Sequence, residues 1–455
     1  MFKCTKRTIR KQINLLRQSF FQIDGLPLNN ILPEKQLKQL AEEAGNYRDK
    51  IFSPLETLRA FLWQVLSDNG SCKEAVANVL VERVKQGQSA NSMNTGPYCK
   101  ARQRLPLSLL ENTTKETGKS LHHKANTSWK WHDYNIVMAD GTTVLMADTE
   151  ENQLEFPQQS AQKAGLGFPI ARIVGLVSLS TGSLIDYAIS AYQGKGNGES
   201  SLLSRILTTL KPGDLLLADR YYCTYAIVAL MSHQDVPVLF KNHAKKKADF
   251  RQGTKLGSKD HLIYWEKPKR KPTWMSESDF KKLPQFLRVR ELSVNGEVYV
   301  TTLLDHRQYS KKEIARLYQQ RWKIELDLRT IKTDMKMEML RCKTPEMVKK
   351  EIAVHFLAYN LIRSAIAQSA IQANATPRSI SFKAAAQLLN GAMKQMVEGT
   401  KNRLIEFCKA ILKAVSSTKI GLRKRQPQPR AVKRRPKPFP LLTVPREIAC
   451  EALRK

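Results

Sequence analysis

The stretch DLLLADRYY, residues 214–222, predicts a buried strand that ends at an acidic residue. Its apolar run is typical of a strand covered on both faces, and Asp219 follows that run directly. The stretch YNIVMADGT, residues 134–142, repeats the pattern, with Asp140 directly after the apolar run Tyr134–Ala139. An aspartate after a strand is commonly only a turn or N-cap residue, so the two acids need a wider context.

That context is the order of the elements around the two strands. Two further strands are predicted at Arg172–Leu179 and Ser183–Gln193, followed by an amphipathic helix at Glu199–Leu210. A helix is expected after Asp219, and Val236–Lys241 is expected to be the last strand. Three strands, helix, strand, helix, strand is the order of a ribonuclease-H-like α/β core. In that arrangement the first and fourth strands are adjacent, so Asp140 and Asp219 are predicted to be neighbours.

A third acid lies on the helix predicted for the stretch SKKEIARLYQQRWKIELDLRTIKTDM, residues 310–335. Ser310 and Glu313 form a capping-box pattern that starts this helix. Its apolar face is predicted to consist of Ile314, Leu317, Ile324, Leu328, Ile331 and Met335. A polar stripe beside that face consists of Tyr318, Arg321, Glu325 and Lys332, spaced by near-multiples of a helical turn. The simpler alternative is that Arg321 and Glu325 are an ordinary i,i+4 ion pair on a solvated face.

Glu325 lies far beyond the strand Val236–Lys241, so an insertion must separate the last strand from the acidic helix. Residues 242–305 fit that insertion, since they are rich in Lys and Arg and contain Trp265 and Trp274. They end in a predicted hairpin, in which Asn295-Gly296 is the turn. The core is therefore expected in two parts, residues 126–241 and 306–372.

The remaining parts of the chain are predicted to be helical. Residues 1–125 carry helix-start signals at Ser53-Pro54 and at Ser71. They also contain a basic segment, expected to be exposed, that contributes Lys100, Arg102 and Arg104. Such a helical module suits recognition of DNA ends, although a merely solvated basic helix would look the same. Residues 373–455 comprise helices and a Pro/Arg/Lys-rich tail at 422–440, which cannot form a core.

Composition narrows the classes of function. Of the 455 residues, 75 are Lys or Arg and 41 are Asp or Glu, so the formal net charge is +34. An excess of this size implies a polyanionic partner, first of all nucleic acid. The sequence lacks an apolar run long enough to span a bilayer, so no membrane partner is expected. Its seven scattered cysteines fit a reduced cytoplasmic protein without structural zinc.

Asp140, Asp219 and Glu325 together would offer oxygen ligands for hard divalent cations. Mg²⁺ is usually held by one or two carboxylates together with substrate phosphates. Two such ions can activate a water or a 3′-hydroxyl and stabilise the leaving oxygen in a phosphoryl displacement. The set thus predicts phosphoryl transfer that needs no general-base histidine.

These motifs resemble a known family. The combination of Asp140-Gly141-Thr142, Asp219-Arg220-Tyr221-Tyr222 and the Tyr-x2-Arg-x3-Glu-x6-Lys stripe is similar to DDE transposases of bacterial insertion sequences. Within them it resembles the insertion-sequence-four family, whose signature is named YREK. The resemblance runs from about Tyr98 to Pro445 and includes the β-rich insertion before the acidic helix.

The resemblance implies a cut-and-paste enzyme that acts on terminal inverted repeats in double-stranded DNA and on target DNA. It implies that Asp140, Asp219 and Glu325 bind two Mg²⁺ ions, for which Mn²⁺ can substitute. A homodimer in the DNA complex and a nucleoid-associated, cytoplasmic location are also expected. Residues expected to contact DNA are Tyr318, Arg321, Lys332, Arg220, Lys100, Arg102 and Arg104, with Trp265 or Trp274 stacking on a flipped base unless they are core tryptophans.

Two rival functions remain open on the sequence. A nonspecific metal-dependent nuclease of the same fold would need the three acids but no recognition of DNA ends. A catalytically silent DNA-binding regulator derived from a transposase would need the basic surfaces but not the acids. The intact acidic set argues against the regulator, and the helical module and basic tail argue against the nuclease.

Overall fold

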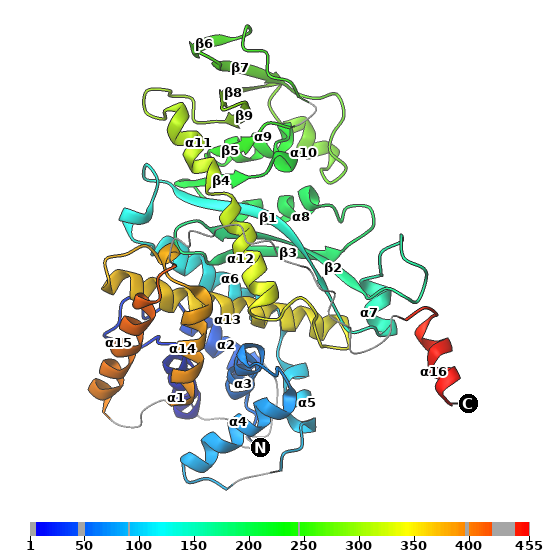
Figure 1. Cartoon of the computed structure of the whole chain (residues 1–455), viewed down its shortest axis with the longest axis vertical. Coiled ribbons are helices and arrows are strands. Elements are labelled where there is room, and N and C mark those ends of the chain that lie inside the picture. The colour runs from blue at the N-terminus through cyan, green and yellow to red at the C-terminus, as the bar shows by residue number, and fades with distance from the viewer. Residues whose placement is uncertain are drawn as a thin grey trace, which may run out of the picture.

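The computed structural model describes residues 6–43, 51–89, 92–243, 246–395, 400–420 and 442–454. The predicted basic tail at 422–440 lies outside these residues. The described chain is a mixed α/β structure in which a large sheet lies above a layer of helices (Figure 1). None of its described helices combines the length and apolarity that crossing a membrane requires.

One nine-stranded sheet, in the order β3-β2-β1-β4-β5-β9-β8-β7-β6, organises the fold. Its first five strands in that order come from the predicted core, and the rest come from the predicted insertion. The strands are β1 (Asn135–Leu145), β2 (Ile170–Ser178), β3 (Leu184–Ala191), β4 (Asp214–Ala218), β5 (Val238–Lys241), β6 (Thr254–Gly257), β7 (Asp260–Glu266), β8 (Phe286–Val294) and β9 (Glu297–Thr301).

The predicted adjacency of the first and fourth strands is confirmed. β1 and β4 pair in parallel from Asn135↔Asp214 to Ala139↔Ala218. The prediction that β1 ends before Asp140 is wrong, because β1 continues to Leu145. Antiparallel pairing with β2 holds this extension, up to the pair Leu145↔Ile170. Asp140 therefore lies within a strand, one residue past the point where parallel pairing with β4 stops.

The β-rich insertion is not a separate sheet. β9 pairs antiparallel with β5, so residues 254–301 extend the core sheet at one edge. The predicted hairpin is confirmed as β8–β9, and its turn residues Asn295 and Gly296 both have positive φ. This conformation is the one that favours Asn-Gly in a two-residue turn. In Figure 1 the insertion forms the upper end of the molecule.

The described N-terminal region is helical, as predicted. Ser53 and Ser71 are N-caps, and each side chain accepts a hydrogen bond from a backbone N–H in the first turn of its helix. The helices of this region are α1 (Lys6–Ser19), α2 (Glu34–Glu43), α3 (Pro54–Leu66), α4 (Cys72–Lys85), α5 (Gly96–Arg104) and α6 (Leu107–His123).

A long buried helix, α13 (Pro345–Gln372), joins the helical layer to the sheet (Figure 1). On the same side α6 approaches β3 so closely that a Cβ at Gly118 would lie 1.8 Å from the Leu184 carbonyl oxygen. The opposite face of the sheet is covered by α8 (Glu199–Ile206) and α9 (Tyr225–His233), which enclose a second apolar core. Apart from the acidic segment, the remaining described α-helices are α7 (Glu150–Glu155), α10 (Glu277–Lys282), α14 (Phe382–Lys394), α15 (Lys401–Ser417) and α16 (Arg446–Arg454).

The acidic segment forms two helices instead of the single one predicted, α11 (Lys311–Gln319) and α12 (Trp322–Thr333). Between them the backbone tightens, since the N–H of Arg321 bonds to the carbonyl of Tyr318 three residues earlier. The predicted capping box at Ser310 and Glu313 is confirmed. All six residues of the predicted apolar face are buried.

Candidate functional site

Asp140 and Asp219 lie side by side at one point of the sheet. Each follows the last parallel pair between β1 and β4, Ala139↔Ala218. One carboxylate oxygen of Asp140 accepts the N–H of Gly141 at 2.8 Å. Asp219 likewise accepts the N–H of Arg220 and caps a short 3₁₀ turn. Each carboxylate thus retains a second oxygen that its own backbone does not engage.

Glu325 is connected to this point through Arg321. The Arg321 guanidinium donates to the Glu325 carboxylate at 2.5 Å and lies 3.5 Å from the Asp140 carboxylate. The predicted i,i+4 pair therefore exists, but it is part of a bridge to β1. The positively charged guanidinium lies between two carboxylates, which is a position that also suits a metal cation.

An open hollow of about 300 Å³ lies beside this bridge. Asp140 and Glu325 line it, together with Lys332 and Arg329. In the described part of the chain, no three acidic, histidine or cysteine side chains are close enough to form a ready-made metal site. A pair of carboxylates fits a hydrated divalent ion, because such an ion completes its coordination shell with water and phosphate.

Burial raises the pKa of Asp140 to about 6. The Gly141 N–H and the Arg321 charge oppose this shift, whereas the charges of Glu199 and Glu325 add to it. Glu199, at the start of α8, is thus a fourth carboxylate near the site. The sequence reasoning missed it, because Glu199 neither follows a predicted strand nor belongs to the stripe of Tyr318, Arg321, Glu325 and Lys332.

Tyr318 and Lys332 lie on either side of the Arg321–Glu325 pair. Tyr318 is half-buried, with its ring 4.9 Å from that of Tyr299 on β9. Burial raises the pKa of the Tyr318 hydroxyl, and the negative charge of Asp219 adds to that shift, which places the two side chains in one neighbourhood. Their contact with DNA stays a prediction.

Exposed aromatic and basic side chains directly follow Asp219 and Arg321 along the chain. Arg220 is exposed beside Asp219, and Tyr221 is 51% exposed. Trp322, the first residue of α12, is 52% exposed. The sequence reasoning passed over Trp322, although an aromatic directly after the stripe arginine is a usable signal for base stacking.

The two tryptophans of the insertion are less exposed than stacking on a DNA base would require. Trp265 is buried, its indole N–H donates to Glu291 at 2.8 Å, and the Lys246 ammonium lies 3.2 Å from its ring centroid. This packing makes Trp265 a core residue, which is the alternative to base stacking that the sequence left open. Trp274 is half-buried and packs against the core formed by α9 and the insertion.

The predicted exposed basic segment is only partly exposed. It forms α5, on which Lys100 and Arg104 are exposed. Arg102 is buried, with its guanidinium over the rings of Phe61 and Tyr98. The prediction that Arg102 belongs to an exposed DNA-contacting cluster is therefore wrong, because the arginine holds α5 against α3.

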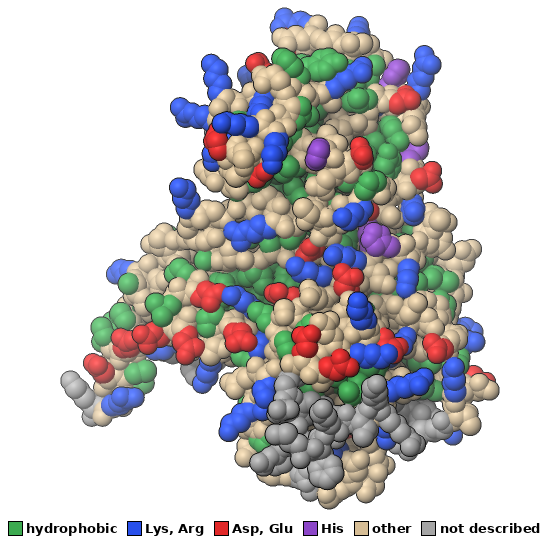
Figure 2. Space-filling model, turned by 180° about the vertical axis from the view of Figure 1, so that it is seen from behind, with side chains coloured by type: hydrophobic (Ala, Val, Ile, Leu, Met, Phe, Trp, Pro, Cys, Tyr) green, Lys and Arg blue, Asp and Glu red, His purple; other side chains and the backbone are tan. Residues whose placement is uncertain are grey.

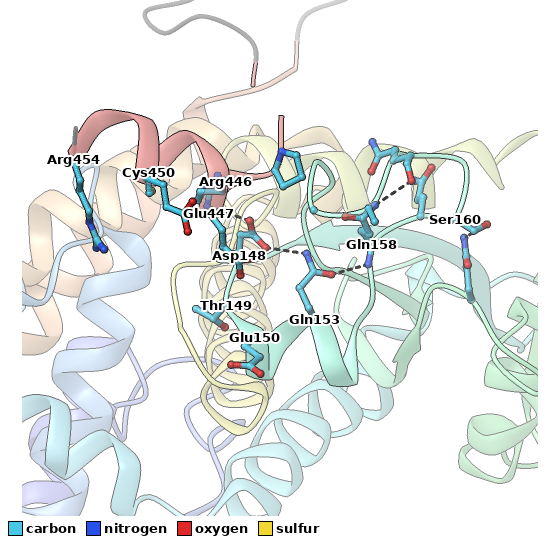
Figure 3. A pocket seen from close by; sticks show the side chains of 17 residues that line it. Asp148, Thr149, Glu150, Gln153, Gln158, Ser160, Arg446, Glu447, Cys450 and Arg454 are labelled. Carbon is cyan, nitrogen blue, oxygen red and sulfur yellow. Dashed lines mark hydrogen bonds and ion pairs between the residues drawn. The ribbon is translucent and has the colours of Figure 1, made fainter. Parts of the chain in front are cut away.

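A separate hollow of about 1170 Å³ lies between α7, the loop after it and α16, and an Arg446–Asp148 ion pair borders it (Figure 3). None of the predicted site residues lines it. On the face shown in Figure 2, Lys and Arg are spread over the insertion end, and acidic side chains form a band across the middle.

Comparisons with known proteins agree with the motifs. The family model described as "Transposase DDE domain" matches residues 131–361. The transposase InsG for insertion sequence element IS4 of Escherichia coli (strain K12) is 26% identical over 353 residues, covering 75% of this chain and 76% of that protein.

Two further matches are weaker, one because it covers a small part of the sequence and the other because its structural similarity is low. The Escherichia coli transposase for insertion sequence element IS421 is 32% identical over 92 residues, 20% of this chain and 25% of that protein. A cryo-EM structure of piggyBac transposase in a synaptic complex with hairpin DNA aligns with a TM-score of 0.44 and 7% identity, over 87% of this chain and 85% of that one.

Proposed function

Because this chain belongs to the transposase DDE domain family, we propose that it is a cut-and-paste transposase that binds the terminal inverted repeats of an insertion sequence. It cleaves the DNA at those ends and joins them to target DNA. The observation that carries the proposal is the register of β1 and β4, which brings Asp140 and Asp219 together beside the helix of Glu325.

The proposal assigns a role to each part of the chain. Residues 126–241 and 306–372 form a ribonuclease-H-like catalytic core, and 242–305 is the insertion within it. Residues 1–125 recognise the DNA ends through exposed basic side chains, and 373–455 supply the helical and basic C-terminal region. Two copies act together on the two ends of one element at the bacterial nucleoid.

Asp140, Asp219 and Glu325 hold two Mg²⁺ ions, for which Mn²⁺ can substitute. When bound, such ions activate a water or 3′-hydroxyl and stabilise the leaving oxygen. The carboxylates of Asp140 and Glu325 must first release Arg321, whose planar fork is suited to a DNA phosphate. Arg321 therefore leaves the two carboxylates and contacts a phosphate of the scissile strand when the transposon end enters the site. Tyr318 and Lys332 contact neighbouring phosphates.

The test uses the full-length chain and a DNA fragment that carries the element's own ends, identified by sequencing the flanking DNA. With Mg²⁺, the wild type is expected to cleave at the ends and to leave a fragment with scrambled ends intact. Asp140→Asn, Asp219→Asn and Glu325→Gln are expected to bind the ends but not to cleave, because binding rests mainly on phosphate contacts. Equal cleavage of both fragments would identify a nonspecific nuclease, and binding without any metal-dependent cleavage would identify a regulator.

A further inference from the structure

Glu199 is the first residue of α8, and its carboxylate lies against Gly141 of β1. A Cβ built at Gly141 would lie 2.7 Å from the Glu199 carboxylate carbon and 2.8 Å from one of its oxygens. Any larger side chain at position 141 would displace that carboxylate. The glycine after Asp140 thus makes room for Glu199.

The turn after β4 also contacts Glu199. The buried hydroxyl of Tyr222 donates to the second Glu199 oxygen at 3.3 Å. Tyr222 closes the short 3₁₀ turn that Asp219 caps. The Glu199 carboxylate therefore touches the residue after Asp140 and a residue of the Asp219 turn, so both strand-end motifs converge on it.

The Glu199 carboxylate has no ion-pair partner within the described part of the chain. Among the described residues, Glu199 forms no ion pair with Lys, Arg or His, although it lies close to another acid. Two divalent ions carry four positive charges, whereas Asp140, Asp219 and Glu325 supply three negative ones. From the geometry we propose that Glu199 is a fourth carboxylate of the divalent-ion site, which helps to hold the ion on the Asp140 side. This inference rests on the proposed function.

An acid in the first turn of a helix can also act only on the helix itself, through the partial positive charge of its N-terminus. That role and a role in ion binding have different consequences. An effect on α8 alone would change the stability of the ion-free protein. Ion binding would change the affinity for the ion and leave the ion-free stability unaffected.

The probe is Mn²⁺, titrated into the full-length chain and followed by the electron paramagnetic resonance signal of free Mn²⁺. Glu199→Gln keeps the shape of the side chain and an acceptor for Tyr222. We expect it to bind Mn²⁺ at least about tenfold more weakly, the loss typical of removing a supporting group at a metal site. Its melting temperature in EDTA should match that of the wild type. Glu150→Gln is the matched control, since Glu150 is also in the first turn of a helix but lines the separate cavity of Figure 3.

Gly141→Ala provides a second variant, because it keeps every charge and places a Cβ against the Glu199 carboxylate. In the wild-type background, we expect Gly141→Ala to weaken Mn²⁺ binding. In the Glu199→Ala background, we expect Gly141→Ala to cause no further loss of Mn²⁺ affinity. Unchanged affinity in Glu199→Gln together with a clear loss in Glu325→Gln would overturn the role of Glu199 and leave the proposed function standing. Unchanged affinity in both variants would overturn the metal site as a whole.

Discussion

Two carboxylates of α12, Glu325 and Asp327, are expected to differ strongly in how much stability the protein loses when each is neutralised. Asp327 is 2% exposed and accepts hydrogen bonds from Arg363 at 2.5 Å and from Arg378 at 2.7 and 2.8 Å. Arg378 also donates to the carbonyls of Leu179 and Ser178 at the end of β2. This network ties the helix that carries Glu325 to α13 and to the sheet.

The expected magnitudes follow from burial. Asp327→Asn leaves the buried Arg363 and the half-buried Arg378 without their counter-charge, and removing one partner of a buried ion pair costs about 3–5 kcal/mol. That is a large part of a total stability of about 5–15 kcal/mol. The Glu325 side chain is 57% exposed, and among the described residues it forms an ion pair only with Arg321, the N-cap of α12. Glu325→Gln is therefore expected to cost no more than about 1 kcal/mol.

The assay is equilibrium unfolding in urea, followed by circular dichroism, for the wild type and both variants in metal-free buffer. We expect a clearly lower midpoint for Asp327→Asn and a nearly unchanged one for Glu325→Gln. DNA-end cleavage should be lost in Glu325→Gln although that variant stays folded. If the two variants lose the same small amount of stability, the Asp327 network does not fix α12, and the reasoning is refuted.

Three further outcomes test other contacts. Arg321→Ala should bind Mn²⁺ about tenfold more tightly in the absence of DNA, because the substitution removes a positive charge that competes for Asp140 and Glu325. The same variant should cleave DNA ends poorly. Arg321→Lys should restore cleavage only partly, since lysine lacks the planar fork of arginine. Near-normal cleavage by Arg321→Lys would contradict the phosphate contact. Gly118→Ala should lower the free energy of unfolding in urea by at least about 3 kcal/mol because of overpacking. A loss below about 1 kcal/mol would show that α6 can move away from β3. Burial lowers the pKa of His355 to about 3. Between pH 6.5 and 5 the unfolded chain therefore takes up a proton that the folded chain excludes, and the free energy of unfolding should fall by about 2 kcal/mol from this group. His355→Leu should remove that part of the pH dependence, and a variant with the same pH profile as the wild type would contradict this role of His355.

The parts of the fold that could be predicted are those encoded locally. The apolar runs before Asp140 and Asp219 specify buried strands, and the order of elements specifies which strands are adjacent. The apolar face of the acidic segment follows from helical periodicity, and its burial is confirmed. These features depend on neighbours in sequence, so single-sequence patterns are sufficient for them.

The features that were missed depend on partners distant in sequence. Gly141 resembles a turn residue, yet pairing with β2 keeps it in β1. Arg102 resembles a solvated residue in a basic segment, but aromatic rings from α3 and α5 cover it. Trp265 is held by Glu291 on the neighbouring strand. No local pattern reveals these contacts, because each needs the register or packing of another element.

Glu199 and Asp327 illustrate the same limit at the site itself. Glu199 reads as an ordinary first-turn acid of a helix, and only its contact with Gly141 and Tyr222 connects it with the strand ends. Asp327 reads as one more charge on the acidic helix, and only burial against Arg363 reveals its structural role. Sequence patterns identified the candidate acids, whereas their supporting contacts required the three-dimensional structure.

The most direct test of the proposed site is the anomalous scattering of Mn²⁺ in crystals of the full-length chain bound to DNA that carries the element's end. We expect anomalous peaks at the strand ends, bounded by the carboxylates of Asp140, Asp219 and Glu325, with Arg321 moved from Asp140 to a DNA phosphate. Peaks that lie away from all three carboxylates, or an Arg321 that still bridges Asp140 and Glu325 beside a bound scissile phosphate, would contradict the proposed metal-dependent mechanism.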